Sequence, residues 1–345
     1  MANIVICADG TWNRPEEDLE KDHATNVLKI ARAVKPKSGA LKQHVFYDWG
    51  LGSYHSAVTA GVSGRGIHKN IVDGYRYIVQ NYAPNDNIYL FGFSRGAYTV
   101  RALCGLINNC GIVKREDAKL IQRAWEIYKM GGNAYKPDGE GSIAFRERHS
   151  HRSRKVHFVG VWDTVGSLGV PFGWLGLLDR KDEFYDTKMG NNVVHARHAV
   201  AIDEQREDFA PTLWNKVNGV DLKQVWFSGV HSDVGGSYPP DKITNTVASD
   251  TPLAWMISEA KSRGLKFESH ITSNLSDGSL APLHKSRRHI YRFRDRLHRD
   301  LVDLDRPTSF HTSVRKRYEA DTSYRPKKLK SLVDSVGWSG LDIET

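Results

Sequence analysis

Unbroken apolar runs alternate with segments of helical apolar spacing along the first third of this chain. The runs cover residues 3–8, 44–47 and 87–93, and helical spacing marks 26–34 and 71–82. Strands that are buried on both faces have such continuous apolar runs, because helices cover each side of their parallel sheet. The alternation therefore predicts an α/β fold, with a mostly parallel central sheet and helices on both faces.

Three more apolar runs continue this sheet in the second half of the chain, over residues 156–162, 192–202 and 224–230. A polar residue follows each run, and ligands of such sheets bind beyond the carboxyl ends of the strands. No clear linker interrupts the pattern. We therefore expect a single domain, with a core over about 3–265 and a basic C-terminal extension over about 266–345 packed on it.

The composition excludes several classes of protein. Three cysteines, an odd and sparse count, argue against a disulfide framework, and none forms the Cys-x-x-Cys pair of common zinc sites. We expect no metal and no organic cofactor. The first residues lack the basic and long apolar regions of a signal peptide, and no run approaches the ~20 apolar residues of a membrane-spanning helix. Synthesis in the cytoplasm is therefore expected, and export by a one-step secretion system would leave no mark of this kind.

A net charge of +9 predicts a surface that attracts anions. Charge alone does not distinguish nucleic acid from an anionic membrane surface. The sequence has no helix-turn-helix, zinc-finger or RNP-like pattern, so nucleic acid is not the expected partner. An anionic membrane surface is therefore the candidate partner that the charge supports.

A glycine–any–serine–any–glycine motif joins the run at 87–93 to a helical segment. Its serine is Ser94, and Gly92 and Gly96 flank it. A sharp strand-to-helix turn lifts the serine hydroxyl clear of the backbone, and crowding in that turn requires glycine at both flanking positions. The motif predicts that Ser94 is a nucleophile in a nucleophile elbow, with the Arg95 N–H directed at the developing oxyanion. The alternative is a plain turn with a surface serine.

Candidate partners for Ser94 follow two of the later strands. Asp163 comes directly after the run at 156–162, and His231 comes directly after the run at 224–230. The order serine, acid, histidine is that of α/β-hydrolases. His231 would take the serine proton as general base, and Asp163 would orient the imidazole and stabilise the imidazolium.

Other residues compete for these roles. Asp203 and Asp208 are alternative acids, because they follow the apolar run that ends at residue 202. His311 is an alternative base, although no buried strand precedes it. Asp233 is a candidate second acid that orients the loop around the histidine.

An early loop and an apolar segment complete the expected site. The second oxyanion donor should come from a loop after an early strand, where the N–H of Gly10 or Thr11 fits. Asp9 would hold this loop by accepting hydrogen bonds from nearby amides, with a metal or phosphoaspartyl site as the weaker alternative. The segment 170–178 is a candidate lid, or else a short buried helix. Its large apolar side chains include Phe172, Trp174, Leu175 and Leu177.

Five blocks of the sequence together resemble the α/β-hydrolase family that includes the class 1 lipase effectors of type VI secretion. The blocks span residues 9–13, 92–97, 160–166, 198–204 and 226–236. The likeness runs from near the start of the chain to about residue 330, which covers most of its length. The resemblance implies an α/β-hydrolase fold.

The same resemblance implies that Ser94, Asp163 and His231 form the catalytic triad. Characterised members hydrolyse phospholipids, so the expected activity is cleavage of a carboxylic ester, with phospholipid or another lipid ester as the first choice. A carboxylesterase or thioesterase for small substrates is the alternative among enzymes. The alternative outside enzymes is a basic module that binds membranes or nucleic acid without catalysis.

Overall fold

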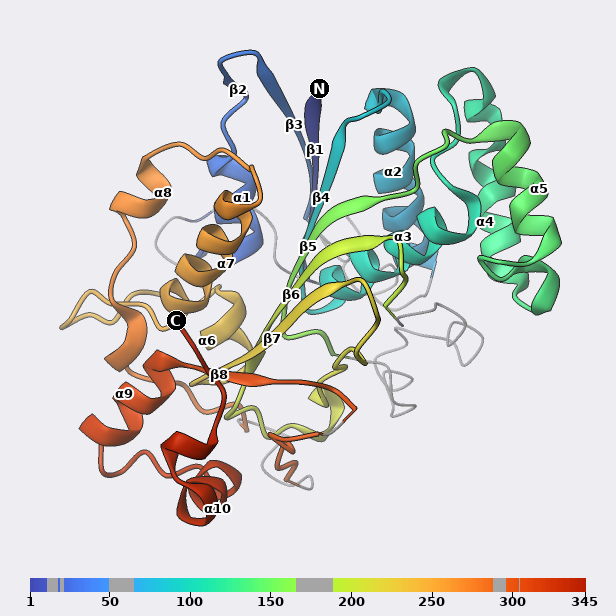
Figure 1. Ribbon diagram of the computed structural model, residues 1–345. Helices are drawn as coiled ribbons and strands as arrows, with labels where there is room; N and C mark the ends of the chain where they lie inside the picture. The colour runs from blue at the N-terminus through green and yellow to red at the C-terminus, as the bar shows by residue number, and fades with distance from the viewer. Residues whose placement is uncertain (11–17, 19–21, 50–64, 166–188, 288–295, 304) are drawn as a thin grey trace.

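Mostly parallel strands form the centre of the molecule (Figure 1). The computed structural model describes the chain except for residues 11–17, 19–21, 50–64, 166–188, 288–295 and 304. Its strands are β1 (Ala2–Ala8), β2 (Lys37–Ser38), β3 (Leu41–Asp48), β4 (Asn87–Phe93), β5 (Val156–Trp162), β6 (Val193–Ala201), β7 (Asp221–Phe227), β8 (Ser309–His311) and β9 (Ile343–Glu344). In the described residues they form one nine-stranded sheet in the order β2-β3-β1-β4-β5-β6-β7-β8-β9. The short β2 pairs antiparallel with β3, and the other recorded pairs are parallel.

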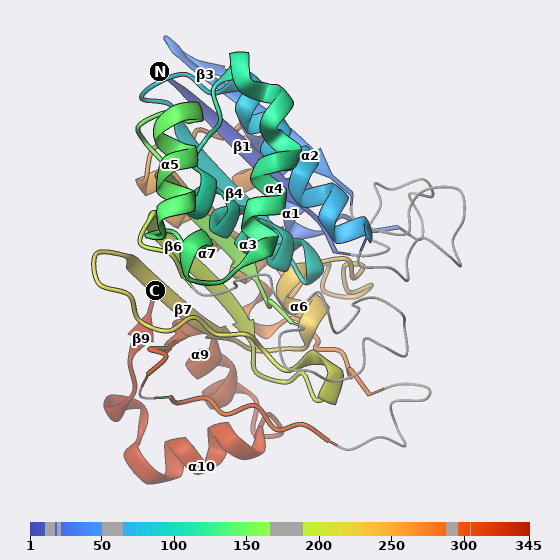
Figure 2. The same ribbon diagram turned by 90° about the vertical axis from the view of Figure 1, so that its right-hand side faces the viewer.

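Helices cover both faces of this sheet (Figures 1 and 2). They are α1 (Asn26–Ala33), α2 (Arg65–Asn81), α3 (Arg95–Cys110), α4 (Ile121–Met130), α5 (Glu140–His149), α6 (His231–Gly235), α7 (Asp250–Ser262), α8 (His270–Ser273), α9 (Thr312–Ala320) and α10 (Lys327–Val336). Helices α2 to α5 lie on one face, and α1 and α7 lie on the other. The predicted α/β fold is therefore confirmed. No helix in the described part of the chain is both long and apolar enough to cross a membrane.

The strand β1 illustrates why its sequence is apolar without interruption. Ile4 and Ile6 pack in one buried cluster with residues of α2 and α3. Val5 and Cys7 pack in a second cluster with residues of α1 and α7. Successive side chains of a strand point to opposite faces, so a strand covered by helices on both sides needs apolar residues at every position.

The C-terminal part of the chain adds to the same sheet. Strands β8 and β9 extend it beyond β7, and a third apolar cluster joins Trp226 of the sheet to Phe310, Val314 and Leu329. The sequence pattern does not indicate these two strands, because so few residues carry no recognisable period. The division into a core and a packed extension stays a prediction, which these contacts support.

The strand β7 begins and ends three residues earlier than its apolar run suggests. It ends at Phe227, and Gly229 then adopts a φ of +109° while its N–H donates to Asp203 Oδ2 at 2.6 Å. A left-handed glycine ends the extended conformation, because it turns the chain away from the sheet. His231 is therefore the first residue of α6 rather than the residue directly after a strand.

Candidate active site

The strand order places a topological switch point between β1 and β4. The chain continues from β1 to β3 on one side, and it returns to β4 on the other side of β1. Clefts for ligands form at the carboxyl ends of strands at such a point. Ser94 follows β4 directly and precedes α3, so the predicted strand–serine–helix arrangement is present.

The backbone at Ser94 has the geometry of a sharp turn. Its φ is 57° and its ψ is −119°, a conformation that costs a non-glycine residue energy and is concentrated at functional sites. The Ser94 N–H donates to Trp162 O at 3.2 Å, which ties the turn to the end of β5. Among the described residues, no hydrogen bond of the Ser94 hydroxyl is recorded, so this oxygen is available to a substrate or a base.

The two glycines of the motif are required by close backbone contacts. A Cβ at Gly92 would lie 2.5 Å from Gly96 O. A Cβ at Gly96 would lie 1.9 Å from Ala8 O, at the end of β1. Neither neighbour can move like a flexible side chain, because both are backbone atoms within the sheet and the turn. The elbow is therefore packed directly against the loop that follows β1.

Asp163 and His231 are hydrogen-bonded to each other. The His231 Nδ1–H donates to Asp163 Oδ2 at 2.6 Å, and both side chains are buried. The His231 ring also packs on Phe93, the residue before Ser94, with ring centroids 4.5 Å apart. Since Nδ1 is occupied by the carboxylate, Nε2 is the nitrogen that remains to accept a proton. The structure thus brings the predicted acid and base together, and it packs the base on the residue before the predicted nucleophile.

Buried charge around Asp163 favours its ionised form. Burial by itself would raise the pKa of this carboxyl, but the Arg299 guanidinium and the His231 hydrogen bond outweigh that effect and hold the pKa well below its usual range. Arg299 Nη1 lies 2.6 Å from Oδ1, and the Ala201 N–H donates to the same oxygen at 3.0 Å. Asp163 therefore stays a carboxylate at every pH at which the protein would work.

The imidazole of His231 is poised to act as a base. Burial lowers the pKa of His231 below its ordinary value, and the hydrogen bond and charge of Asp163 offset this only in part. The ring is therefore neutral at neutral pH, which is the state that can accept the proton of a hydroxyl.

The competing residues have other partners. Asp203 Oδ2 accepts hydrogen bonds from the Gly229 N–H at 2.6 Å and from the Tyr324 hydroxyl at 2.9 Å, and burial raises the pKa of Asp203 to about 6. The Asp163 carboxylate occupies His231 Nδ1, which leaves Asp208 no place on that nitrogen.

His311, the competing base, is engaged elsewhere. Its Nδ1 lies 2.8 Å from Ser313 Oγ, and its ring stacks on Phe227 with centroids 4.7 Å apart. Burial lowers the pKa of His311 to about 4. This histidine ends β8 and begins no loop that carries a candidate acid or nucleophile, so a packing role explains its surroundings.

The second oxyanion donor remains a prediction. In the structure the Gly10 N–H donates to Asp9 Oδ1 at 3.0 Å, so this amide is already occupied. Asp9 Oδ2 accepts from the Thr25 hydroxyl at 2.5 Å and from the Tyr47 hydroxyl at 2.9 Å, so side-chain hydroxyls bind Asp9 in addition to the one expected kind of donor, the Gly10 amide. Thr11 lies outside the described residues, as do the lid candidates Phe172, Trp174, Leu175 and Leu177.

Sequence reasoning missed two groups that contact the acid and the base. Arg299 binds both oxygens of Asp163. Glu204, which is buried and paired with Arg206 at 2.8 Å, accepts the backbone N–H of His231 at 3.3 Å. Glu204 follows a buried strand by three residues, a signal that could have been used. No local signal marks Arg299, because it is one of many basic residues in its part of the chain.

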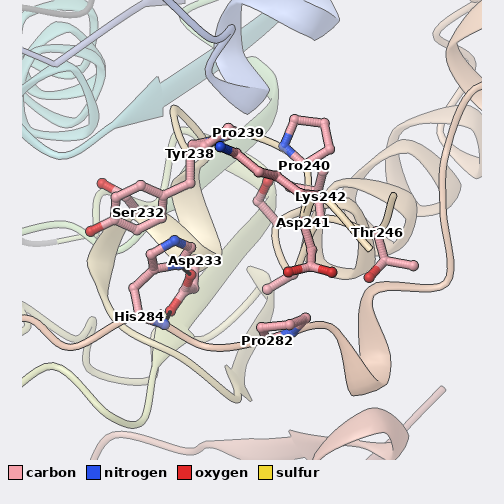
Figure 3. Close-up of a pocket in the computed structure, with 13 residues that line it drawn as sticks. Ser232, Asp233, Tyr238, Pro239, Pro240, Asp241, Lys242, Thr246, Pro282 and His284 are labelled. Atoms are coloured by element: carbon pink, nitrogen blue, oxygen red, sulfur yellow. Dashed lines mark hydrogen bonds and ion pairs between the residues drawn. The ribbon is translucent and has the colours of Figure 1, made fainter. Parts of the chain in front are cut away.

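A cavity of about 220 Å³ is lined in part by Ser232 and Asp233 of α6 (Figure 3). Its wall carries a second carboxylate–imidazole pair, in which His284 Nδ1–H donates to Asp233 Oδ1 at 2.6 Å. The Tyr238 ring stacks on His284 with centroids 3.7 Å apart. Asp233 Oδ2 also accepts the Val230 N–H at 3.0 Å, so Asp233 holds the residue before His231. No cluster in the described residues has the ligands for a metal ion.

Comparison with known proteins gives distant relatives. The "Uncharacterized protein YEL023C" of Saccharomyces cerevisiae is 29% identical over 229 residues, which is 60% of this chain and 32% of that protein. A crystal structure of an uncharacterized protein from Pseudomonas aeruginosa aligns with a TM-score of 0.49 and 17% identity, over 80% of this chain and 48% of that chain. The structure of the Tle1 effector bound to the VgrG spike of the type VI secretion system aligns with a TM-score of 0.42 and 18% identity, over 71% of this chain and 52% of that chain. The chain thus spans between a third and about half of these relatives.

The decisive comparison is with a family profile. The profile described as the catalytic domain of the type VI secretion phospholipase effector Tle1-like family matches residues 2–259. This range covers about three quarters of the chain, and it includes the turn at Ser94 and the hydrogen-bonded pair of Asp163 and His231. The chain therefore belongs to the Tle1-like family of type VI secretion phospholipase effectors.

Proposed function

We propose that this protein is a serine hydrolase that cleaves the carboxylic esters of phospholipids, with Ser94, Asp163 and His231 as its triad. The observation that carries the proposal is the 2.6 Å hydrogen bond between His231 and Asp163, formed beside the strained turn of Ser94. A buried aspartate on Nδ1 and a free Nε2 are what a histidine needs to activate a serine. The family supports a phospholipase or lipase activity.

In the proposed first step, His231 Nε2 takes the proton of the Ser94 hydroxyl as its oxygen bonds to the ester carbonyl carbon. The negative charge that develops on the carbonyl oxygen would face the N–H of Arg95, the first residue of α3. The helix dipole adds to this stabilisation. When the tetrahedral intermediate collapses, the carbon–oxygen bond to the alcohol breaks, and imidazolium returns its proton to the departing alcohol.

In the proposed second step, water repeats the same sequence on the acyl-enzyme. His231 removes a proton from water as the water oxygen attacks the acyl carbon, and the fatty acid leaves as Ser94 regains its proton. The Asp163 carboxylate stays ionised throughout and stabilises the imidazolium in each step. Arg299 and the Ala201 N–H keep that carboxylate in place.

The family and the charge support the proposed substrate and the proposed route of export. A net charge of +9 favours approach to an anionic lipid surface. A structure of the Tle1 effector has that protein bound to a VgrG spike of the type VI secretion system. We extend this route of export to the present chain as part of the proposal.

Labelling with a fluorophosphonate probe tests the serine mechanism. We expect mass spectrometry of the digested protein to find the probe on Ser94, because only an activated serine reacts. Salt-sensitive binding to vesicles without any labelling would instead support a basic module that lacks catalysis.

The substrate class is tested by comparing phospholipid vesicles with short-chain monomeric esters. A phospholipase should hydrolyse vesicles at the higher rate, and deletion of residues 170–178 should remove that preference if this segment is a lid. Equal or better activity on monomeric esters, unchanged by the deletion, would assign the protein to the small-substrate esterases or thioesterases.

A further inference from the structure

A buried arginine lies directly behind the candidate catalytic acid. Arg299 Nη1 donates to Asp163 Oδ1 at 2.6 Å, and Nη2 donates to Asp163 Oδ2 at 3.1 Å. Both side chains are inaccessible to solvent. This two-pronged contact matches the planar guanidinium to the planar carboxylate, and it fixes the orientation of the carboxylate as well as its charge.

Backbone carbonyls hold the guanidinium in this position. Nη1 also donates to Ala201 O at the end of β6, and Nη2 donates to Phe209 O, each at 2.6 Å. The Phe209 ring in turn packs edge-on against the His231 ring, with centroids 5.0 Å apart. One side chain therefore links the acid, the end of a neighbouring strand and a residue that contacts the base.

The other charged groups near the pair do not replace Arg299. The Glu204 carboxylate and the Arg206 guanidinium, which follow β6, are paired at 2.8 Å and offset each other. His198 on β6 donates nothing to Asp163 and accepts the Thr164 N–H at 3.1 Å. Burial lowers the pKa of His198 to about 3, so this ring is neutral. Arg299 is therefore the cation that balances the Asp163 carboxylate.

Two carboxylates that hold the loop before His231 are also bound from the C-terminal part of the chain. The Tyr324 hydroxyl donates to Asp203, which accepts the Gly229 N–H. His284 donates to Asp233, which accepts the Val230 N–H. Tyr324, His284 and Arg299 all lie after residue 265, outside the range 2–259 that matches the family profile.

We propose that Arg299 is a positioning residue that keeps Asp163 ionised and oriented toward His231, so that the segment after residue 265 completes the catalytic centre. The inference rests on the proposed triad. Without Arg299 only the Ala201 N–H and His231 would offset the cost of burying the carboxylate, and the acid–base pair would retain a proton to higher pH. A protonated pair cannot accept the proton of Ser94.

The test compares the variants Arg299→Gln and Arg197→Gln. Arg197 is an equally buried arginine whose ion pairs with Asp221 and Glu259 lie away from the triad, so it controls for the loss of a buried cation. For Arg299→Gln we expect kcat on phospholipid vesicles to fall on the order of 10²-fold, with KM little changed. The acid limb of kcat/KM should move to higher pH by about one unit or more. Arg197→Gln should lower the melting temperature without moving that limb.

Two further variants separate charge from geometry. Arg299→Lys keeps a cation without the fork, so we expect the acid limb to stay near the wild-type position while kcat falls. Added guanidinium should restore part of the activity of Arg299→Ala, because the missing group fits the cavity left behind. If Arg299→Gln does not fold, Arg299→Lys decides the question, and wild-type kcat in that variant would overturn the proposal.

A readout that needs no activity keeps this proposal distinct from the proposed function. In the Ser94→Ala background, the pKa of the His231 ring, measured by NMR, should rise when Arg299 is replaced by Gln and not when Arg197 is. If the wild-type protein cleaves no ester but this shift occurs, the proposed function is wrong, while the effect of Arg299 on the Asp163–His231 pair is confirmed. An unchanged His231 titration, or an equal kinetic loss in both arginine variants, would overturn the role of Arg299.

Discussion

The nucleophile side and the acid–base side of the candidate site are built in different ways. The turn at Ser94 lies within five residues of sequence, and it contacts the backbone at the ends of β1 and β5. The acid–base side joins Asp163, His231 and Arg299, and the contact between Asp163 and Arg299 spans 136 residues. A short-range turn is specified by local sterics, whereas a buried charge network depends on the packing of the whole chain.

Replacement of the nucleophile is expected to cause the largest loss of activity. Ser94→Ala should lower kcat on phospholipid vesicles by about 10⁴-fold or more, because no other group can form the acyl-enzyme. The melting temperature should change little. Ser273→Ala, at an exposed serine of α8, is the matched control. Full activity in the Ser94→Ala variant would show that Ser94 is not the nucleophile.

Substitution of the acid tests the long-range side. Asp163→Asn should lower kcat by roughly 10³- to 10⁴-fold, because an amide favours the wrong imidazole tautomer and leaves the Arg299 charge unbalanced. Activity assays and thermal denaturation of the same preparation measure both effects. The analogous change Asp203→Asn is expected to retain most activity, and the reverse order of losses would assign the acid role to Asp203.

A single methyl group tests the sterics of the turn. Gly96→Ala would place Cβ 1.9 Å from Ala8 O, so we expect about a 10²-fold loss of kcat and a clear drop in melting temperature. Gly131→Ala is the control, since Gly131 has a φ of +59° with nothing within 4 Å of the added Cβ. That variant should cost about 1 kcal/mol of stability and no activity. Similar behaviour of the two variants would show that packing against β1 is unimportant.

The pH dependence of kcat/KM reports on the charge network. Activity should fall as His231 gains a proton, and the depressed pKa of His231 places that fall below pH 6.5, the ordinary value for the side chain. Asp163 should contribute no separate limb in the working range, because its pKa is lower still. A half-maximal point clearly above pH 6.5 in the free enzyme would contradict a buried, neutral His231.

The smallest expected effect is on stability. The pKa of Asp203 is raised to about 6, so the folded protein holds this proton more tightly than the unfolded chain, whose Asp pKa is about 3.9. Stability should therefore fall as pH rises between these two values. Relative to Asp203→Asn, the wild type should lose roughly 2 kcal/mol of stability between pH 4 and pH 7 in urea denaturation. An equal pH dependence of stability in the two proteins would mean that folding does not raise the pKa of Asp203.

The sequence alone determined the strands of the core and the identity of the residues at their ends. Continuous apolar runs reveal β1, β4, β5 and β6, because burial on both faces acts on every residue of such a strand. The motif around Ser94 is also recognisable in the sequence, although only the steric need for Gly92 arises within the turn and that for Gly96 comes from Ala8 of β1. The chain order of Asp163 and His231 indicated a pair that the structure then joined by a hydrogen bond.

Only the tertiary structure decided what surrounds that pair. It assigned Asp203 to the Gly229 and Tyr324 contacts, and it brought Arg299 to Asp163. These outcomes depend on charges and donors that meet across long stretches of chain, where no periodicity or local crowding leaves a trace in the sequence. Burial then gives each contact its effect, because a carboxylate removed from water takes its charge state from its nearest neighbours.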